Sequence, residues 1–467
     1  MRMRLPHLLR WLVLLALALA AGCSTPPPAR VEVESDRVLQ ALVSGAGFSG
    51  AVVLMRDGEV VYERAAGLAQ RSPDRPYTPD TPSDGGSLAK TMTAAAFWEL
   101  VAEGRLSLDD TVTRHVPEYP YPGQTLRQLV THRNGLPDYG VLDAEFAPGQ
   151  VRGTADLLRA TARRQPQPVL PPGVQAEYSN LGFDTAALVV ERITGQTIET
   201  WWRERYFKPL GMQSTFARPA RFADWPVPRV PGYRQQGGAW EAFDAYDDEA
   251  FIGASNVYAS ARDWARWGDA FASGRVMAPA RLDAGLRQAM LDSGTDSVLT
   301  CLSWYCDGTR QRCHYSGAYN AFFSHVYWDR TRREVVALVS NSTLPPWRSA
   351  RLAADLMDAL AGRAATPESA PALTRISRDD RQRIAGDYRS ATLGLLVIDV
   401  QDRRPFLRLN GGERVSLFPV PDGVFYAPML DLWLGFTGAA DDPTMQIRSV
   451  FHVAEAKRVA APAGRTP

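Results

Sequence analysis

Lysine is almost missing from this chain. Arginine accounts for 49 of the 52 basic residues, and the only lysines are Lys90, Lys208 and Lys457. A surface position that needs a positive charge is therefore filled by arginine almost everywhere. The two side chains differ because a partly buried lysine amine can lose its proton, whereas a guanidinium stays charged at any accessible pH. Lysine can thus mark a position that needs a removable proton, and Lys90 stands three residues after Ser87.

The chain also lacks an excess of charge of either sign. Its 52 basic and 51 acidic residues leave a formal net charge of +1, which becomes −2 if the first 22 residues, with three arginines and no acid, are removed. No basic patch indicates nucleic acid as a partner, and no acidic run indicates a charged tail. The remaining 445 residues are enough for a large core and for two domains.

Cysteine is scarce as well. Apart from Cys23, the chain has Cys301, Cys306 and Cys313, which lie close enough in sequence for two of them to pair in an oxidising compartment. The Asp307-Gly308 turn signal predicts a hairpin with Cys306 and Cys313 on facing strands, and hence a disulfide between them. The tight Cys-x-x-Cys spacing of a structural zinc site is absent, so we expect no metal.

The first 23 residues have the pattern of a secretory signal. Three arginines precede an apolar run from Trp11 to Ala21, which Gly22-Cys23 follow. This run is too short to be interpreted first as a transmembrane helix. The stretch from Leu19 to Cys23 resembles a bacterial lipoprotein cleavage box, with leucine one place earlier than usual. The resemblance implies a signal peptide at 1–22, lipidation of Cys23 and, with Ser24 next to it, the outer membrane of a Gram-negative cell. Cleavage by the ordinary signal peptidase is the alternative.

Prolines follow Cys23 closely and predict an extended tether over residues 23–36. The next region, 37–362, begins with a strand pair around Asp57-Gly58 and ends with another that turns near 329–332. Between them lie segments of helical period at 87–103, 182–195 and 260–273. This order predicts an α+β domain, in which an antiparallel sheet is assembled from both ends and a helical lobe is inserted.

A linker at 363–371 is expected to lead into a second region, 372–457. From Ile384 onward, short apolar runs alternate with turn residues, a pattern typical of a small antiparallel barrel or sandwich. We find no catalytic constellation in this region.

Ser87 and Lys90 are the first candidates for catalysis. In a helix the two lie one turn apart on the same face, where a neutral amine can activate a hydroxyl as a nucleophile. The alternative is an ordinary surface lysine, because Ser-x-x-Lys is a frequent accident. The histidines leave a Ser-His-Asp triad possible in principle, but no Gly-x-Ser-x-Gly surrounds any serine.

A lysine base needs a further polar group across the cleft, and two segments can supply it. Tyr178-Ser179-Asn180 comes directly before an amphipathic helix, and Tyr315-Ser316-Gly317 stands where a strand begins. The alternative for the first segment is a turn that simply begins a helix, since asparagine and serine favour such positions.

With these motifs in this order, the chain resembles the serine β-lactamase and penicillin-binding-protein family. It is most similar to the branch of class C β-lactamases, D-Ala-D-Ala carboxypeptidases, D-amino-acid peptidases and related esterases. Ser87-x-x-Lys90 matches the first motif of the family and Tyr178-x-Asn180 the second. The resemblance covers residues 37–362, and the second region is similar to the lipocalin-like β-barrel often appended to such domains. It implies that Ser87 is the nucleophile and that Lys90, with a phenolate-like Tyr178, is the base.

The third motif departs from the family pattern. Where the family often has Lys-Thr-Gly or His-x-Gly, this chain has Tyr315-Ser316-Gly317 preceded by His314, and a shift that aligns His314 moves the glycine out of place. The charge that holds a substrate carboxylate is then missing, which disfavours efficient β-lactam hydrolysis. The resemblance implies substrate contacts from Asn180, His314, Tyr315, Ser316 and Gly317. It also implies an oxyanion hole formed by the N–H groups of Ser87 and Ala318, and no metal or organic cofactor.

The expected function is therefore that of a lipid-anchored serine hydrolase of the cell envelope, facing the periplasm. It would form an acyl-enzyme on Ser87 with a small-molecule or peptide substrate, namely D-amino-acid peptides, amides or esters. Two alternatives stay open: a true class C-type β-lactamase, and a non-catalytic lipoprotein that binds cell-wall peptide or a partner protein. Retention of Ser87, Lys90, Tyr178 and Asn180 argues against the last, because a binding module does not need all four.

Overall fold

The computed structural model describes the chain from residue 28 onward with several gaps. The described residues are 28–168, 171–173, 178–278, 280–281, 284, 300–301, 303–306, 311–344, 346–365, 376–390, 394–401, 403–409, 415–420, 423–427, 432–439, 442–448 and 453–459. The predicted signal peptide and Cys23 lie outside these residues. Within the described ranges, no helix combines the length and the apolar character needed to cross a membrane.

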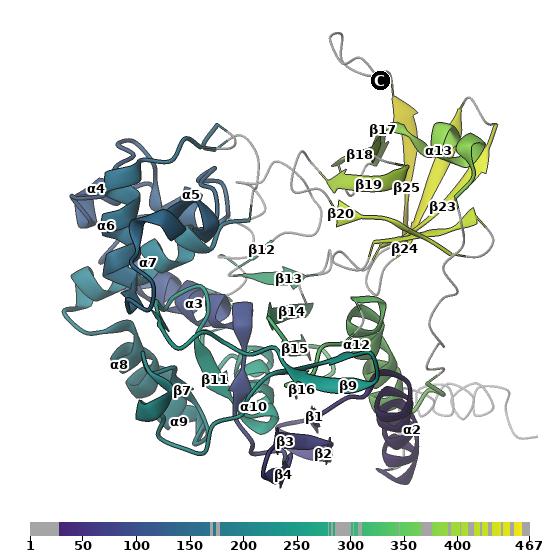
Figure 1. Cartoon of the computed structure of the whole chain (residues 1–467), viewed down its shortest axis with the longest axis horizontal. Coiled ribbons are helices and arrows are strands. Elements are labelled where there is room, and N and C mark those ends of the chain that lie inside the picture. The colour runs from purple at the N-terminus through teal and green to yellow at the C-terminus, as the bar shows by residue number, and fades with distance from the viewer. Residues whose placement is uncertain are drawn as a thin grey trace, which may run out of the picture.

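A seven-stranded antiparallel sheet forms the centre of the first region (Figure 1). Its strand order is β12-β13-β14-β15-β16-β1-β2. The strands are β1 (Gly50–Arg56), β2 (Glu59–Ala66), β12 (Thr300–Cys301), β13 (Trp304–Cys306), β14 (Arg312–Tyr319), β15 (Phe322–Asp329) and β16 (Glu334–Ser340). Strand β1 pairs with β16 from Gly50 opposite Ser340 to Arg56 opposite Glu334. The prediction of a sheet assembled from both ends of the domain is therefore confirmed.

Helices cover both faces of this sheet. On one face, α2 (Pro28–Ala46) and α12 (Pro346–Leu360) lie side by side, and Val52 and Leu54 of β1 pack against them. On the other face, α10 (Ala261–Ala272) and α3 (Ala89–Ala102) pack against Ala51 and Val53. The side chains of β1 thus alternate between two cores, as the two-residue period of a strand requires.

The start of α2 corrects the predicted tether. The helix begins at Pro28, whereas the prolines had predicted extended chain through residue 36. Proline fits the first turn of a helix because the N–H that it lacks would have no helical partner there. Val31 is buried in the core between α2, α12 and the sheet, so this part of the chain is packed structure.

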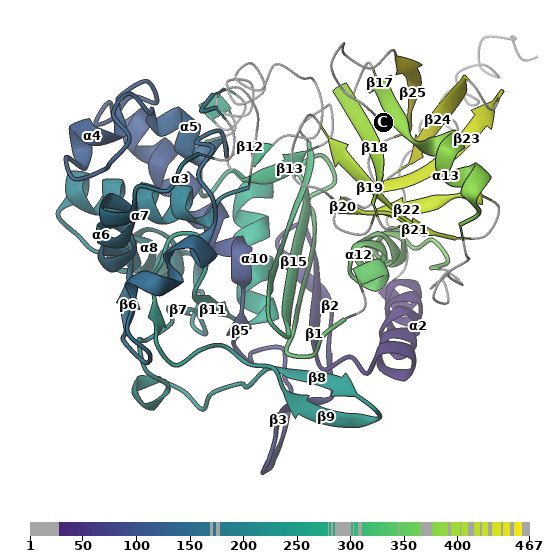
Figure 2. The same ribbon diagram turned by 45° about the horizontal axis from the view of Figure 1, so that its top comes forward.

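A helical lobe is inserted between β2 and β12 (Figure 2). The helices α3, α7 and α10 confirm the three predicted helical segments, with bounds shifted by a few residues. The helices of the lobe are α4 (Val112–His115), α5 (Leu126–Val130), α6 (Thr154–Arg164), α7 (Asn180–Thr194), α8 (Ile198–Trp202) and α9 (Lys208–Leu210), with the turns η1 (Gly86–Leu88), η2 (Tyr139–Glu145), η3 (Arg203–Phe207) and η4 (Phe222–Asp224). Short strands connect them: β3 (Leu68–Arg71), β4 (Asp74–Pro76), β5 (Ser83–Asp84), β6 (Arg152–Gly153), β7 (Phe216–Ala217), β8 (Tyr233–Gln236), β9 (Ala239–Ala242), β10 (Glu249–Ala250) and β11 (Val257–Ala259).

The second region is a nearly closed antiparallel barrel. Its nine strands run in the order β20-β19-β18-β17-β25-β24-β23-β22-β21, and the two outer strands are separated in sequence by Leu417 alone. A barrel removes most of the open sheet edges that a sandwich leaves. The elements are α13 (Arg378–Ile384), β17 (Gly386–Ser390), β18 (Gly394–Gln401), β19 (Arg404–Leu409), β20 (Val415–Ser416), β21 (Phe418–Pro419), β22 (Phe425–Ala427), β23 (Leu432–Gly438), β24 (Pro443–Arg448) and β25 (Val453–Val459). Of the two predicted architectures, the barrel is confirmed.

Candidate active site

Ser87 lies on the turn η1, directly before the buried helix α3. Gly86 in this turn has a φ of +49°, and a Cβ on it would lie only 2.8 Å from the amide nitrogen of Ala318. Both the backbone conformation and the space therefore favour glycine. Oδ1 of Asp84 accepts a hydrogen bond from the Gly86 amide at 2.7 Å, which fixes the turn. The fold thus presents Ser87 at the start of a helix with its side chain only partly buried.

Lys90 is fully buried one turn after Ser87, so the surface-lysine alternative is wrong. Its Nζ lies 3.2 Å from Ser87 Oγ, and it donates to Oδ1 of Asn180 at 2.6 Å and to the carbonyl of Ala254 at 2.9 Å. Burial lowers the pKa of Lys90 to about 7, although the negative charges of Asp184 and Asp138 act in the other direction and raise it. In the neutral amine, the two N–H bonds can serve Asn180 and Ala254 while the lone pair faces Ser87. This geometry would let a neutral Lys90 accept the proton of Ser87.

Tyr178 approaches Ser87 from the other side. Its hydroxyl lies 2.5 Å from Ser87 Oγ. Burial raises the pKa of Tyr178 above its ordinary value, so the expectation of a phenolate-like side chain is wrong for the resting protein. The neutral phenol can donate to Ser87 while Ser87 donates to Lys90. Ser179 caps α7 by accepting from the Gly182 amide, so the segment begins a helix and also carries Tyr178 and Asn180 to the site.

His132 is a residue of this site that sequence reasoning missed. Its ring stacks on Tyr178, with centroids 4.7 Å apart and planes at 25°, and its Nδ1 accepts from the Ser179 amide at 3.2 Å. Burial, and secondarily the charge of Lys90, lowers the pKa of His132 to about 3, which keeps the ring neutral. The residue adopts a φ of +55°, uncommon for a side chain other than glycine. No repeating pattern in the sequence indicates this role.

We expect His132→Asn to lower kcat by a factor of about ten to a hundred with little change in KM, because Tyr178 loses the ring that orients it. Asparagine tolerates positive φ and keeps an oxygen acceptor for Ser179, so the fold is retained. The matched variant His132→Phe keeps a ring but loses the acceptor, and is expected to lower the melting temperature instead. Steady-state kinetics and thermal unfolding of both variants check this. Parental kcat in His132→Asn would show that the ring does not position Tyr178.

The third motif lies on β14, where alternate side chains face opposite ways. Tyr315 is buried and interacts with Tyr178 through a hydrogen bond, and burial raises its pKa well above the ordinary value. His314 faces the other side, where its ring stacks on His325 with centroids 5.3 Å apart. Strand alternation therefore directs the His314 side chain away from Tyr315, and Ser316, on the same face of β14 as His314, is exposed.

Gly317 brings β14 into contact with the nucleophile turn, which is η1 with Ser87. A Cβ on Gly317 would lie 1.9 Å from the carbonyl oxygen of Gly85 and 2.8 Å from the amide nitrogen of Ser87. Gly86 of the same turn lies equally close to Ala318 of β14. The two amides proposed for the oxyanion hole, those of Ser87 and Ala318, therefore belong to two backbone segments that touch.

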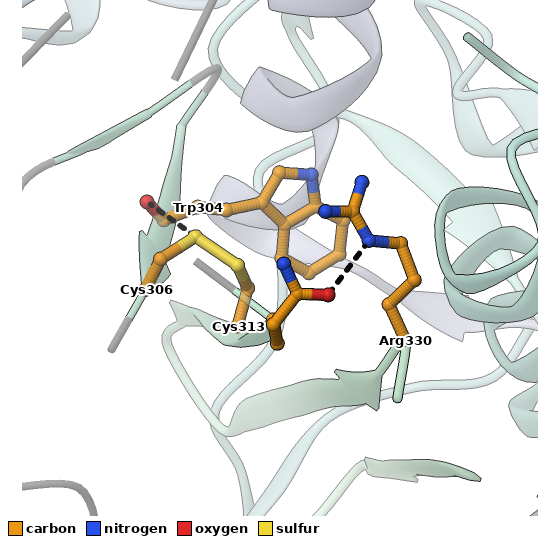
Figure 3. The surroundings of a disulfide bond; sticks show 5 residues. Trp304, Cys306, Cys313 and Arg330 are labelled. Carbon is orange, nitrogen blue, oxygen red and sulfur yellow. Dashed lines mark hydrogen bonds between the residues drawn. A yellow bond between two sulfur atoms is a disulfide. The ribbon is translucent and has the colours of Figure 1, made fainter. Parts of the chain in front are cut away.

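The predicted disulfide between Cys306 and Cys313 is confirmed (Figure 3). The two cysteines are direct partners on β13 and β14, and the bond crosslinks these strands two residues before Tyr315. Cys301 lies on β12. Among the residues that the structure describes, no group of three or more histidine, cysteine or acidic side chains is placed to hold a metal ion.

Comparison with known proteins agrees with this geometry. Residues 36–361 match the family model described as Beta-lactamase. The chain belongs to the β-lactamase family. It is 36% identical over 194 residues to the esterase EstB of Burkholderia gladioli, covering 37% of this chain and 49% of that protein. It is 31% identical over 234 residues to a D-aminopeptidase of Cereibacter sphaeroides, covering 49% of this chain and 44% of that protein.

The chain thus spans about half the length of these curated relatives. The octameric penicillin-binding protein homologue from Pyrococcus abyssi has a similar fold, with a TM-score of 0.59 and 19% identity. That likeness covers 91% of this chain and 99% of the other, so it extends beyond residues 36–361.

Proposed function

We propose that this protein hydrolyses amides and esters of D-amino acids and their peptides through an acyl-enzyme on Ser87. The observation that carries the proposal is the buried cluster in which Lys90 Nζ lies 3.2 Å and the Tyr178 hydroxyl 2.5 Å from Ser87 Oγ. The esterase and D-aminopeptidase relatives support the substrate class. Because Leu19 to Cys23 resemble a lipoprotein cleavage box, we propose that the enzyme is anchored in the envelope of a Gram-negative cell and faces the periplasm.

The proposed reaction begins when neutral Lys90 takes the proton of Ser87 and Oγ attacks the substrate carbonyl. The negative oxygen of the tetrahedral intermediate is held by the amides of Ser87 and Ala318. Protonated Lys90 returns the proton through Tyr178 to the departing nitrogen or oxygen, and the carbon–leaving-group bond breaks. A water molecule then attacks the acyl carbonyl carbon while its proton passes to Tyr178 and Lys90. The bond between this carbon and Ser87 Oγ breaks, and the proton returns to Oγ.

The third motif supports an uncharged leaving group. Tyr315 offers a phenol where relatives with Lys-Thr-Gly offer a cation, and its raised pKa keeps it neutral. A neutral phenol donates one hydrogen bond but contributes no charge to a carboxylate. β-Lactam antibiotics carry such a carboxylate, so we propose amide and ester hydrolysis ahead of β-lactam hydrolysis. Cleavage of a chromogenic cephalosporin at a rate comparable to that of esters would favour the β-lactamase alternative.

A fluorophosphonate probe tests the nucleophile. We expect intact mass spectrometry of the mature chain to show one covalent adduct, which is absent in Ser87→Ala and retained in the matched variant Ser44→Ala, an exposed serine of α2. An unlabelled but folded parent, or an adduct that persists in Ser87→Ala, would contradict the proposed acyl-enzyme.

A further inference from the structure

A cavity of about 450 Å³ lies in the helical lobe, and none of the residues that line it takes part in the mechanism above. Its volume falls in the range of roughly 300–1,000 Å³ that is common for small-molecule sites. It is formed by η2 with the residues after it and by the segment 246–251. The walls include the aromatic side chains of Tyr139, Phe146, Tyr246 and Phe251, together with charged side chains.

Hydrogen bonds connect both walls of this cavity to the site. Tyr139 donates to Asp184, whose other oxygen accepts from the Ala254 amide at 2.9 Å, and the carbonyl of Ala254 holds Lys90. On the opposite wall, Glu249 accepts from the hydroxyl of Tyr319, the residue after Ala318. Glu249 of the cavity wall is therefore held to the Ala318 end of β14.

The direction of β14 indicates which part of the substrate, the leaving group or the acyl group, points toward the cavity. The leaving group must lie beside its proton donor, Tyr178, which interacts with Tyr315. Tyr319 is four residues further along β14, or roughly 13 Å at about 3.3 Å per residue. A carbonyl held between the amides of Ser87 and Ala318 thus directs its leaving group toward Tyr315 and its acyl group toward Tyr319 and the cavity.

The charges of the cavity favour a cation. The guanidinium of Arg152 contacts three carboxylates, those of Asp143 at 3.5 Å, Asp248 at 3.3 Å and Glu249 at 3.2 Å. Glu249 also pairs with the buried guanidinium of Arg218 at 3.7 Å, so two cations face three anions. The Asp143 side chain is 67% exposed. Tyr246 at the same cavity is 57% exposed and offers a ring face. Anionic oxygens beside exposed aromatic rings attract an ammonium group on an apolar stem.

We propose that this cavity is the subsite for a lysine-type side chain on the acyl residue of the substrate, with Asp143 and Asp248 as acceptors of its ammonium group. The aromatic walls contact the methylene stem. The inference rests on the proposed function for the orientation of the substrate, and it narrows the substrate class to acyl groups with a cationic side chain.

Two matched substrates test the proposal: the p-nitrophenyl esters of Nα-acetyl-D-lysine and of Nα,Nε-diacetyl-D-lysine, which differ only in the side-chain charge. We expect kcat/KM to favour the first at least about tenfold, the scale of a hydrogen bond to a charged group. The double variant Asp143→Asn with Asp248→Asn should lose most of this preference. Asp109→Asn, which changes a carboxylate that is 76% exposed on another part of the surface, should retain it. Equal rates in the parent, or an unchanged preference in the double variant, would overturn the subsite.

A binding experiment separates this proposal from the proposed function. The Ser87→Ala variant cannot form an acyl-enzyme. In this variant, the difference in affinity between Nα-acetyl-D-lysine amide and its Nε-acetyl derivative, measured by calorimetry, reports on the cavity. Tighter binding of the lysine amide, lost in the triple variant with Asp143→Asn and Asp248→Asn, supports the subsite even if the parent hydrolyses nothing. Hydrolysis of both esters at equal rates, with equal binding of both amides, supports the proposed function and rejects the subsite.

Discussion

Replacing Lys90 with arginine is expected to slow acylation of Ser87 by a factor on the order of a hundred to ten thousand, the usual contribution of a general base. Arginine keeps the positive charge but cannot give up its proton, so it cannot accept the proton of Ser87. The matched variant Lys90→Met has a side chain of similar length without any base. Both variants should therefore be slow. Rapid acylation in Lys90→Arg, measured with the fluorophosphonate probe on folded protein, would show that Lys90 is not the base.

The pH dependence of the parent follows from the same residue. Burial lowers the pKa of Lys90 to about 7, and only the neutral amine accepts a proton, so kcat/KM should rise with pH through about 7 and level off above it. Asp184 faces Lys90, and burial raises its pKa to about 6, so it titrates on the acidic side of this limb. His132 is already neutral in this pH range and does not contribute to the rise in kcat/KM. In Lys90→Met, the rise near pH 7 should disappear. A rise that persists in this variant would assign the limb to another group.

Gly317→Ala is expected to lower kcat at least about a hundredfold, the loss typical of one oxyanion donor. The new Cβ would lie 1.9 Å from the carbonyl oxygen of Gly85, a backbone atom, so the strand or the nucleophile turn has to move. Either movement separates the amides of Ser87 and Ala318 from the position of the oxyanion. The measurement is kcat for a chromogenic ester, at a temperature where circular dichroism shows folded protein.

Gly435→Ala is the matched control for this change. Gly435 also lies in a strand, β23, but a Cβ there would meet only Cβ of Gln446 at an ordinary 3.9 Å. We expect this variant to keep the parental kcat. If Gly317→Ala also kept it, the contact between β14 and the nucleophile turn would not control the oxyanion donors.

Much of the fold could be predicted because its signals are local. Asp57 and Gly58 adopt φ values of 53° and 84°, the conformation that an Asp-Gly hairpin turn requires, and the flanking runs form β1 and β2 as expected. The prediction of an extended tether over residues 23–36 is wrong because prolines favour extended chain in a linker but also fit the first turn of a helix. Pro28 occupies the first position of a helix, and only the packing of Val31 against the sheet distinguishes the two outcomes.

The site was less predictable than the fold. Ser87 lies on the turn η1 and Lys90 in the first turn of α3, which follows it directly, so their spacing alone predicts that they meet. The opposite orientation of His314 and Tyr315 was also predictable, because a two-residue period puts neighbouring residues of a strand on opposite faces. The neutral state of Tyr178 and the contact of His132 depend on burial and on segments far apart in sequence, which no local pattern specifies.

The pairing of β1 with β16 also determines when this domain can fold. Gly50 finds its partner, Ser340, only after nearly the whole hydrolase domain has been synthesised. Until then, β1 lacks its partner on one side, and the apolar residues on both of its faces lack their complete cores. Such non-local pairing slows folding and prolongs the exposure of aggregation-prone surface. Fragments that end before β16 should therefore fail to form the central sheet, even when they contain Ser87, Lys90 and Tyr178.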